Sequence, residues 1–511
     1  MKNDKYYNSL LQGDSGALKR ALYKSMGFTE NALKKPLVAV VNTYTNATPG
    51  HFNLNELCAQ VERGIAAAGG TAMTFGTIAP CDGIAEGHEG MRYILPSRDL
   101  ITASVECMVR AHRFDGMVLL GSCDKIVPGL LMAAARLDIP AIFLNGGPMM
   151  PAAYKGKHYD GNIVTEAVGW KARGEISEAE FREIEDLAEP CVGSCAMLGT
   201  ANTMGCMAEA MGMSLPGTAV IPAVYAKRMQ AAYSTGEAVM ELIRGRITAR
   251  QIITRQSIEN AIAVLMGMGG STNGIMHLQA IYKEAGLGEL PLTKFGEMSG
   301  RIPQVASVYP ASPYDMVDFY EAGGVPAVMK ELERYLNTGC LCCNGRTVTE
   351  NLSGAASSPR REVIRTAEEP FHPTGGVAVL TGNMGAKGRG GEAGGYPGAA
   401  HAVYGKGASV RQRAGGMRRD SGRGYPAGDH GGAALRGTQG RPRNAGDVPA
   451  HEMPGRDGSV RQLCGGHGRK VFRVQPRVFC GTYFPGGLRG RRAGPGGGRR
   501  FHRHRRSGRK P

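Results

Sequence analysis

The chain has 511 residues, 42% of them hydrophobic, which is enough for about two or three domains and a sizeable core. Its net charge of +17 is uneven, since residues 388–511 hold 26 Lys and Arg against 6 Asp and Glu, and the preceding 387 residues hold 35 against 38. The polar N-terminus has no apolar signal region and no run of about 18 apolar residues occurs, so we expect no membrane span and, with 12 cysteines, a reduced cytoplasmic protein.

Short apolar stretches alternate with helical patterns in the first part of the chain. The expected strands are residues 36–42, 71–78, 117–120 and 139–147, and the expected helices are residues 8–26, 54–68, 99–112 and 130–137, with a turn at 95–98. Continuous apolar runs are typical of parallel strands buried on both faces, and their alternation with helices indicates a doubly wound α/β sheet.

Further along, the pattern becomes mostly helical. An acidic helix is expected over residues 174–186, helices dominate to about residue 335, and residues 375–383 resemble the first strand of a second domain. We therefore expect an α/β domain over residues 1–339, a connector and the start of a second domain over 340–387, and a low-complexity basic tail over 388–511.

Cys123, Asp124 and Lys125 directly follow the central expected strand, and Cys81 and Asp82 repeat the Cys-Asp pair just after another. Carboxyl ends of parallel strands meet at one edge of the sheet, where α/β proteins bind ligands. A thiolate suits a soft metal and a carboxylate suits Mg²⁺. The alternative is a set of polar turns that cap strands.

Cys195 lies in a Gly-Ser-Cys turn before a helix, where the helix N-terminus stabilises a thiolate. Three thiolates could hold an iron–sulfur cluster with one iron open to substrate, beside a magnesium ion on the carboxylates. Each cysteine alone also fits a small buried residue. That second interpretation is kept for the helical Cys58, Cys107 and Cys206; Cys340, Cys342 and Cys343 could bind zinc, but no second ligand pair completes the site.

Six stretches together resemble the dihydroxy-acid dehydratase family, which also contains phosphogluconate and sugar-acid dehydratases. They are Thr48-Pro-Gly-His51, Cys81-Asp-Gly-Ile-Ala-Glu-Gly-His88, Leu95-Pro-Ser-Arg98, Ser122-Cys-Asp-Lys-Ile-Val-Pro-Gly129, Gly193-Ser-Cys195 with Thr200-Ala-Asn-Thr-Met204, and Gly269-Gly-Ser-Thr-Asn273. The resemblance covers residues 1 to about 387.

The resemblance implies a [4Fe-4S] or [2Fe-2S] cluster on Cys123 and Cys195, and Mg²⁺ on Asp82, Asp124 and a carbamylated Lys125. Some members carry a third cysteine near the position of Thr48, so Cys81 is the candidate for that ligand here and Cys191 the second choice. The family reaction removes water from a 2,3-dihydroxy acid to give a 2-oxo acid, in valine and isoleucine biosynthesis. A homodimer is implied as well.

The family takes the C2 proton with a serine in a C-terminal Asp-Gly-Arg-Phe-Ser-Gly motif, and a glutamate in that region completes the magnesium site. Neither motif occurs in this chain, so no catalytic base is assigned. A sugar-acid dehydratase of the same family is the alternative enzyme. An Arg/Gly-rich nucleic-acid-binding protein is the alternative of another class.

The Arg/Gly-rich tail resembles the family's C-terminal domain translated in the wrong frame. Codons for residues 467–474 can be chosen so that a one-nucleotide shift encodes Thr-Asp-Gly-Arg-Phe-Ser-Gly, and residues 436–447 and 499–505 can hide two further family motifs in the same frame. A disordered nucleic-acid arm, a linker and a novel domain are the competing interpretations. We expect a frameshift near Gly388, a tail that does not fold because large apolar residues are few, and an inactive chain.

Overall fold

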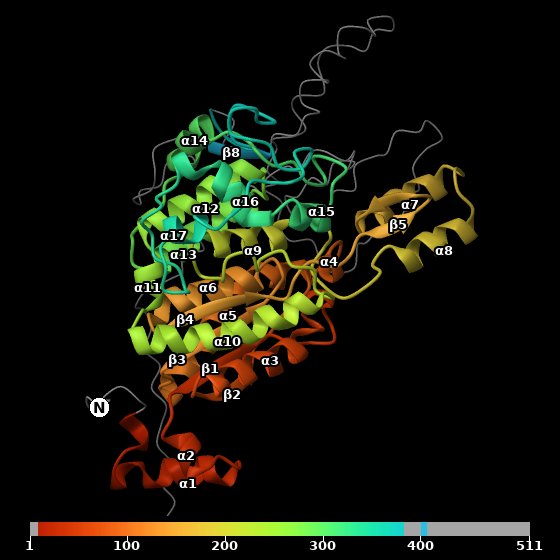
Figure 1. Ribbon diagram of the computed structural model, residues 1–511. Helices are drawn as coiled ribbons and strands as arrows, with labels where there is room; N and C mark the ends of the chain where they lie inside the picture. The colour runs from red at the N-terminus through yellow and green to blue at the C-terminus, as the bar shows by residue number, and fades with distance from the viewer. Residues whose placement is uncertain (1–8, 383–399, 406–511) are drawn as a thin grey trace, which may run out of the picture.

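A four-stranded parallel sheet forms the framework of the N-terminal half of the computed structural model, which describes residues 9–382 and 400–405 (Figure 1). Its strands are β1 (Leu37–Asn42), β2 (Thr71–Gly76), β3 (Gly116–Gly121) and β4 (Ala141–Asn145), in the order β2-β1-β3-β4. Every residue of β1, β3 and β4 is buried, as continuous apolar runs predict. The predicted α/β class is confirmed.

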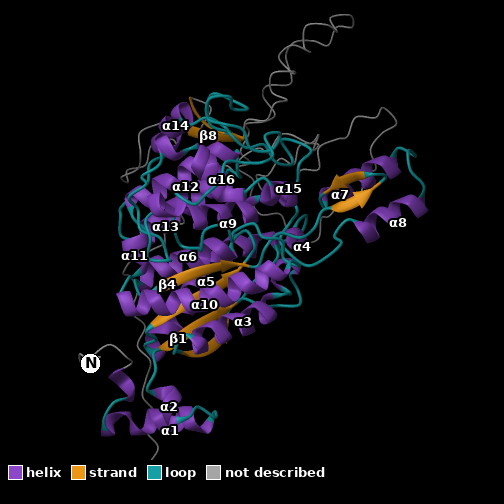
Figure 2. Ribbon diagram, in the orientation of Figure 1, coloured by secondary structure: helices purple, strands orange, loops and turns teal. Residues whose placement is uncertain are grey.

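Helices cover both faces of this sheet, as Figure 2 shows. Helix α3 (Leu54–Ala67) packs with α10 (Ala226–Gly245) against β1, β3 and β4, whereas α5 (Met91–His112) packs on α6 (Ile126–Leu137). The chain runs from β1 outward to β2, then crosses back to β3 and continues to β4 on the other side. The carboxyl ends of β1 and β3 therefore form the topological switch point, where doubly wound proteins bind their ligands.

The predicted turn at residues 95–98 is wrong, because α5 runs through it with Pro96 inside the helix. Ile94, Ser97 and Ile101 are buried at helical spacing, so one apolar face continues across the proline. Burial of this face against the neighbouring helix compensates for the hydrogen bond that Pro96 cannot donate.

A small lobe projects from the main body at the right of Figure 1. It consists of β5 (Ala152–Tyr154), β6 (Lys157–Tyr159), α7 (Asn162–Ala172) and α8 (Glu178–Leu187), around a separate cluster of buried residues that includes Tyr154, Ile163 and Ile184. The acidic helix expected at 174–186 corresponds to α8, and its capping box on Ser177 explains its later start.

The described chain contains further helices. They are α1 (Ala17–Ser25), α2 (Glu30–Leu33), α4 (Asp82–Ala85), α9 (Thr200–Ala210), α11 (Ala249–Ile252), α12 (Arg255–Met268), α13 (Asn273–Glu284), α14 (Leu292–Arg301), α15 (Met316–Glu321), α16 (Gly324–Glu331) and α17 (Val348–Leu352), with short 3₁₀ turns at Ser9–Leu11, Asp14–Gly16, Pro49–His51 and Glu333–Tyr335. The long helix expected at 8–26 is thus shorter, because two 3₁₀ turns precede α1. No helix among these is both long and apolar enough to cross a bilayer.

The strand expected at residues 375–383 is β7 (Val377–Gly382), which pairs antiparallel with β8 (Ala400–Gly405). Strand β8 lies within the stretch for which the sequence predicts no fold. The rest of that tail, with the three motifs hidden in another frame, lies outside the described residues.

Burial at the centre of the sheet allows a prediction about stability. Leu119 in β3 is fully buried, so Leu119→Ala should lower the free energy of unfolding by about 2–5 kcal/mol, because it removes buried methyl groups and leaves a cavity. Urea unfolding followed by circular dichroism measures the change. The control is Leu18→Ala in α1, where the side chain is 72% exposed and the effect should stay within about 0.5 kcal/mol.

Candidate functional site

Segments with polar and thiol side chains converge at the carboxyl end of the sheet. Residues 43–51 follow β1 and residues 122–125 follow β3, so both segments flank the switch point. Asp82 begins α4, which follows β2, and Lys125 immediately precedes α6. The strand-end positions of the predicted residues therefore place them at one edge of the sheet.

Lys125 is the buried centre of an ion cluster with two partly exposed carboxylates. Its side chain is 2% exposed, and its Nζ lies 2.6 Å from Asp82 Oδ2 and 3.4 Å from Asp124 Oδ2. A buried ammonium is stable only with partners of opposite charge, and the two carboxylates provide them. The cluster joins the turn after β2 to the turn after β3.

Cys123 lies next to this cluster and close to two other thiols. Burial raises the pKa of the Cys123 thiol well above its usual value, and the neighbouring Cys81 and Cys195 raise it further, followed by Asp124 and Asp82. The structure thus brings the three predicted cysteines and both aspartates into one electrostatic neighbourhood. Without a cation, such crowding keeps Cys123 protonated; a bound metal would reverse this by attracting the thiolate.

The third thiol, that of Cys195, lies on the segment that precedes α9. Cys195 is exposed, yet desolvation by the surrounding protein raises the pKa of its thiol well above the usual value. Asp160, Asp124, Glu189 and Cys81 add to this shift in that order. Asn202 of α9 fixes the turn, because its Nδ2 donates to the backbone oxygens of Cys195 at 2.6 Å and Met197 at 2.7 Å.

The other cysteines are placed differently. Cys191 Sγ accepts a hydrogen bond from the backbone N–H of Met150 at 3.2 Å. A tetrahedral zinc ion holds thiolates about 3.8 Å apart. In the described part of the chain, His158, Asp315 and Asp318 are the only group of three Cys, His, Asp or Glu ligand atoms lying within 4.8 Å of one another, so Cys340, Cys342 and Cys343 do not form such a site. Cys81, Cys123 and Cys195 do not form such a close group either. The thiolates of an iron–sulfur cluster bind different iron atoms, so they need not lie as close together as the ligands of one zinc ion.

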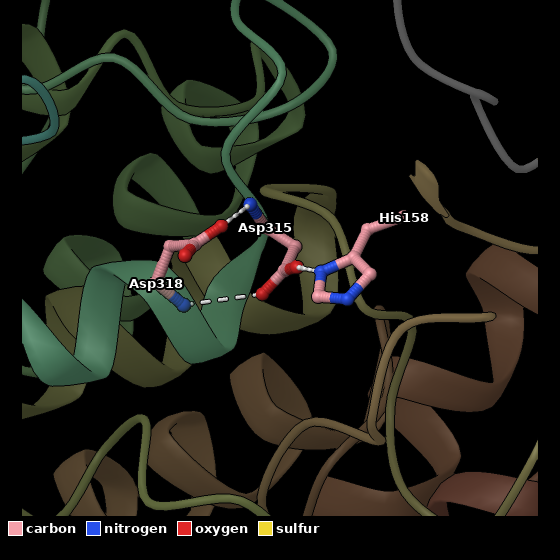
Figure 3. A group of neighbouring side chains, drawn as sticks. All are labelled: His158, Asp315 and Asp318. Carbon is pink, nitrogen blue, oxygen red and sulfur yellow. Dashed lines mark hydrogen bonds and ion pairs between the residues drawn. The ribbon is translucent and has the colours of Figure 1, made fainter. Parts of the chain in front are cut away.

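Figure 3 shows His158, Asp315 and Asp318, which form a helix cap. Asp315 Oδ1 accepts from the backbone N–H groups of Val317 and Asp318 at the start of α15, and Asp318 Oδ2 accepts from the Asp315 N–H at 2.9 Å. His158 Nδ1 lies 3.1 Å from Asp315 Oδ2 and ties the lobe to this cap. Since capping and an ion pair with Arg360 occupy these oxygens, we assign the group a structural role.

Two buried histidines at this edge were given no role from the sequence. His51 is fully buried, and this burial lowers its pKa to about 4. Burial also lowers the pKa of His277 in α13 well below its usual value, and the nearby charges of Lys125 and Arg98 lower it further. His277 Nδ1 faces Arg98 Nη1 at 3.4 Å. Both imidazoles are therefore neutral. No local sequence pattern marks them, because their partners lie far away in the chain.

The fold and the site together define an α/β enzyme whose reactive groups gather at the switch point of a doubly wound sheet. Comparison with known proteins makes the class specific. A family model described as the N-terminal region of dihydroxy-acid/6-phosphogluconate dehydratases matches residues 35–351.

Three relatives give the same result. Dihydroxy-acid dehydratase 1 of Methanosarcina acetivorans is 48% identical over 376 residues, 73% of this chain and 68% of the relative. The dihydroxy-acid dehydratases of Methanothermobacter thermautotrophicus and Acetivibrio thermocellus are each 45% identical, over 76% and 74% of this chain and 70% and 68% of their own lengths. The chain belongs to the dihydroxy-acid/6-phosphogluconate dehydratase family, whose members are hydro-lyases that act on dihydroxy acids.

Proposed function

We propose that the intact enzyme converts a 2,3-dihydroxy acid to a 2-oxo acid by removing water, in the synthesis of branched-chain amino acids. The observation that carries the proposal is the convergence of three thiols, two carboxylates and one buried lysine at the switch point. The sugar-acid reaction of the same family is the alternative. Comparing 2-oxo acid formation from 2,3-dihydroxyisovalerate and from a sugar acid, in a chain with a restored frame, tests the choice.

The residues present suit an iron–sulfur cluster and a magnesium ion. Cys81, Cys123 and Cys195 would hold the cluster, with Cys191 as the second choice for the third ligand, and Asp82 and Asp124 would hold Mg²⁺. The negative groups that raise the pKa of Cys123 would each be stabilised by a cation. When bound, the two metals supply Lewis acids for the leaving 3-hydroxyl and for the substrate carboxylate and 2-hydroxyl.

Lys125 has a distinct part in this proposal. Its ammonium neutralises Asp82 and Asp124, so in this form it competes with a divalent cation for the same oxygens. Carbamylation, in which the uncharged Lys125 amine adds CO2 and releases one proton, would replace the positive charge by an anionic oxygen ligand, and both carboxylates would then become available to the metal. The protein's contribution is to hold these oxygens at the edge of the sheet, because Asp82 begins α4 after β2, and Asp124 and Lys125 lie between β3 and α6.

The domain organisation, the reading frame and the assembly belong to the same proposal. We place the α/β domain at residues 1–339 and the start of the second domain at 340–387, and we assign residues 388–511 to a shifted reading frame that removes the serine base and the glutamate ligand. We also propose a cytoplasmic homodimer for the intact enzyme. The basic tail would bind nucleic acids nonspecifically, with an affinity that falls as salt increases.

Asp124→Asn tests the magnesium site. The substitution removes one anionic oxygen beside Lys125, so the affinity for Mg²⁺, measured by calorimetric titration, should fall by at least about 10- to 100-fold, while iron and sulfide content stays unchanged. Asp186→Asn, on an exposed position of α8, is the matched control and should bind Mg²⁺ as the parent does. Equal affinities in all three proteins would contradict the assignment.

A further inference from the structure

The segment Thr48-Pro49-Gly50-His51, called here the 48–51 loop, carries no thiol and no carboxylate. It follows β1, and Thr48, Gly50 and His51 are all buried. A connecting loop normally runs over the surface, because its backbone groups need water or other partners. The partners of this loop are the three segments that carry Cys81, Cys123 and Cys195.

The first contact is to the segment before Cys81. Thr48 Oγ1 donates a hydrogen bond to the backbone oxygen of Ala79 at 2.7 Å, and Thr48 is only 2% exposed. Water therefore does not compete for this bond, and its loss would leave a buried carbonyl without this partner. The bond fixes the backbone two residues before the first thiol.

The second contact is to the segment before Cys195. The backbone N–H of Gly193 donates to Pro49 O at 3.2 Å. Gly50 packs against the same segment, since a Cβ added to it would lie 3.5 Å from Gly193 O and 3.5 Å from Ser194 Cα. The loop thus lies directly against the turn that presents the second thiol.

The third contact is to Cys123 itself. His51 Nε2 accepts hydrogen bonds from the backbone N–H groups of Ser122 at 3.3 Å and Cys123 at 3.2 Å. Its Nδ1 lies 2.8 Å from Thr43 O, which can only accept, so the ring is neutral with its proton on Nδ1. Both ring nitrogens are therefore satisfied, and the imidazole joins the end of β1 to the turn after β3.

Gly50 completes the contact with Cys123. A Cβ at this position would lie 2.7 Å from Cys123 Sγ, closer than real Cβ atoms approach a sulfur. The loop backbone therefore lies beside the thiol without room for any side chain. A glycine is required here by close approach to a reactive group rather than by an unusual backbone angle.

We propose that the 48–51 loop is a positioning element that sets the separations of the Cys81, Cys123 and Cys195 thiols. The inference rests on the proposed function, in which these thiols hold an iron–sulfur cluster. A cluster needs its thiolates at fixed separations, and the loop contacts all three segments within two residues of each cysteine. His51 and Gly50 act through Cys123, which both contact.

Gly50→Ala is the first test, on the full chain reconstituted anaerobically with ferrous iron and sulfide. The added methyl should displace the Cys123 thiol, so a chelator should remove iron about 10- to 100-fold faster than from the parent, with altered visible absorbance. Gly83→Ala is the matched control, because its Cβ would lie 3.9 Å from Cys81 Sγ, an ordinary contact. Parent-like iron release from Gly50→Ala would overturn the proposal.

His51 provides a second test that separates positioning from folding. His51→Gln keeps an acceptor oxygen for the Ser122 and Cys123 N–H groups, whereas His51→Leu leaves both donors without an acceptor. We expect Gln to restore most of the parent's cluster absorbance and Leu to lose it, in chains whose unfolding by circular dichroism remains cooperative. If Gly50→Ala does not fold, this pair decides the question, and equal cluster content in Gln and Leu would overturn the proposal.

The two proposals fail in different ways. If Cys123→Ser and Cys195→Ser retain the parent's iron and sulfide, the proposed function is wrong. If both cysteine variants lose the cluster while Gly50→Ala and His51→Leu keep it with parent-like release rates, the proposed function stands and the positioning role is wrong.

Discussion

A single-nucleotide correction near codon 388 should convert an inactive chain into an active dehydratase. The reason is the composition of residues 388–511, with 26 Lys and Arg against 6 Asp and Glu, and the three family motifs that a shifted frame can encode there. The Asp-Gly-Arg-Phe-Ser-Gly motif, on which the family resemblance places a serine base, does not occur in the sequence as written. Loss of a general base typically costs about 10²–10⁴-fold in rate, and loss of the magnesium-binding glutamate adds to this.

The measurement is the rate of 2-oxo acid formation from 2,3-dihydroxyisovalerate by the chain as written and by the corrected chain, both reconstituted with iron, sulfide and Mg²⁺. We expect turnover only in the corrected chain. A third protein that carries the correction and replaces the restored serine with alanine is the control, and it should return to the low rate. Comparable turnover by the uncorrected chain would mean that the tail, or a residue before it, supplies the base.

Cys123→Ser should abolish the cluster, the second large effect expected. Burial raises the pKa of the Cys123 thiol, and the neighbouring Cys81 and Cys195 raise it further. A serine hydroxyl is a far poorer ligand for iron than a thiolate. Cys195→Ser should have the same consequence. Iron, acid-labile sulfide and visible absorbance of the purified variants report the loss.

Cys107→Ser is the matched control, because Cys107 is exposed on α5 and is not one of the proposed cluster ligands. It should retain the parent's iron and sulfide. A cluster that survives in both Cys123→Ser and Cys195→Ser would show that other residues hold it.

Strands β1, β3 and β4 could be predicted because each is buried along its whole length, which leaves continuous apolar runs such as residues 117–120. The lobe was harder to predict. Its strands β5 and β6 are three residues long, and α7 buries only Ile163 and Ala167, so neither leaves a clear periodic pattern. The turn predicted at residues 95–98 was wrong for a different reason, because tertiary packing keeps α5 helical across Pro96.

The candidate site also contains residues whose meeting could be predicted from the sequence and residues whose role could not. Cys81, Asp82, Cys123, Asp124 and Lys125 could be predicted to meet because strand ends share an edge, a geometry that the topology fixes. The role of His51 could not, because its partner Cys123 is 72 residues away and the contact depends on backbone N–H groups that no sequence pattern reports. His277 is likewise separated from Arg98 by 179 residues.

We propose that the switch point of this sheet holds an iron–sulfur cluster. The iron and acid-labile sulfide content of the full chain, purified and reconstituted without oxygen, tests this most directly. We predict about two or four of each per chain with visible absorbance, all lost together in the Cys123→Ser variant. A folded chain that binds no iron and sulfide beyond the level of this variant would contradict the proposal.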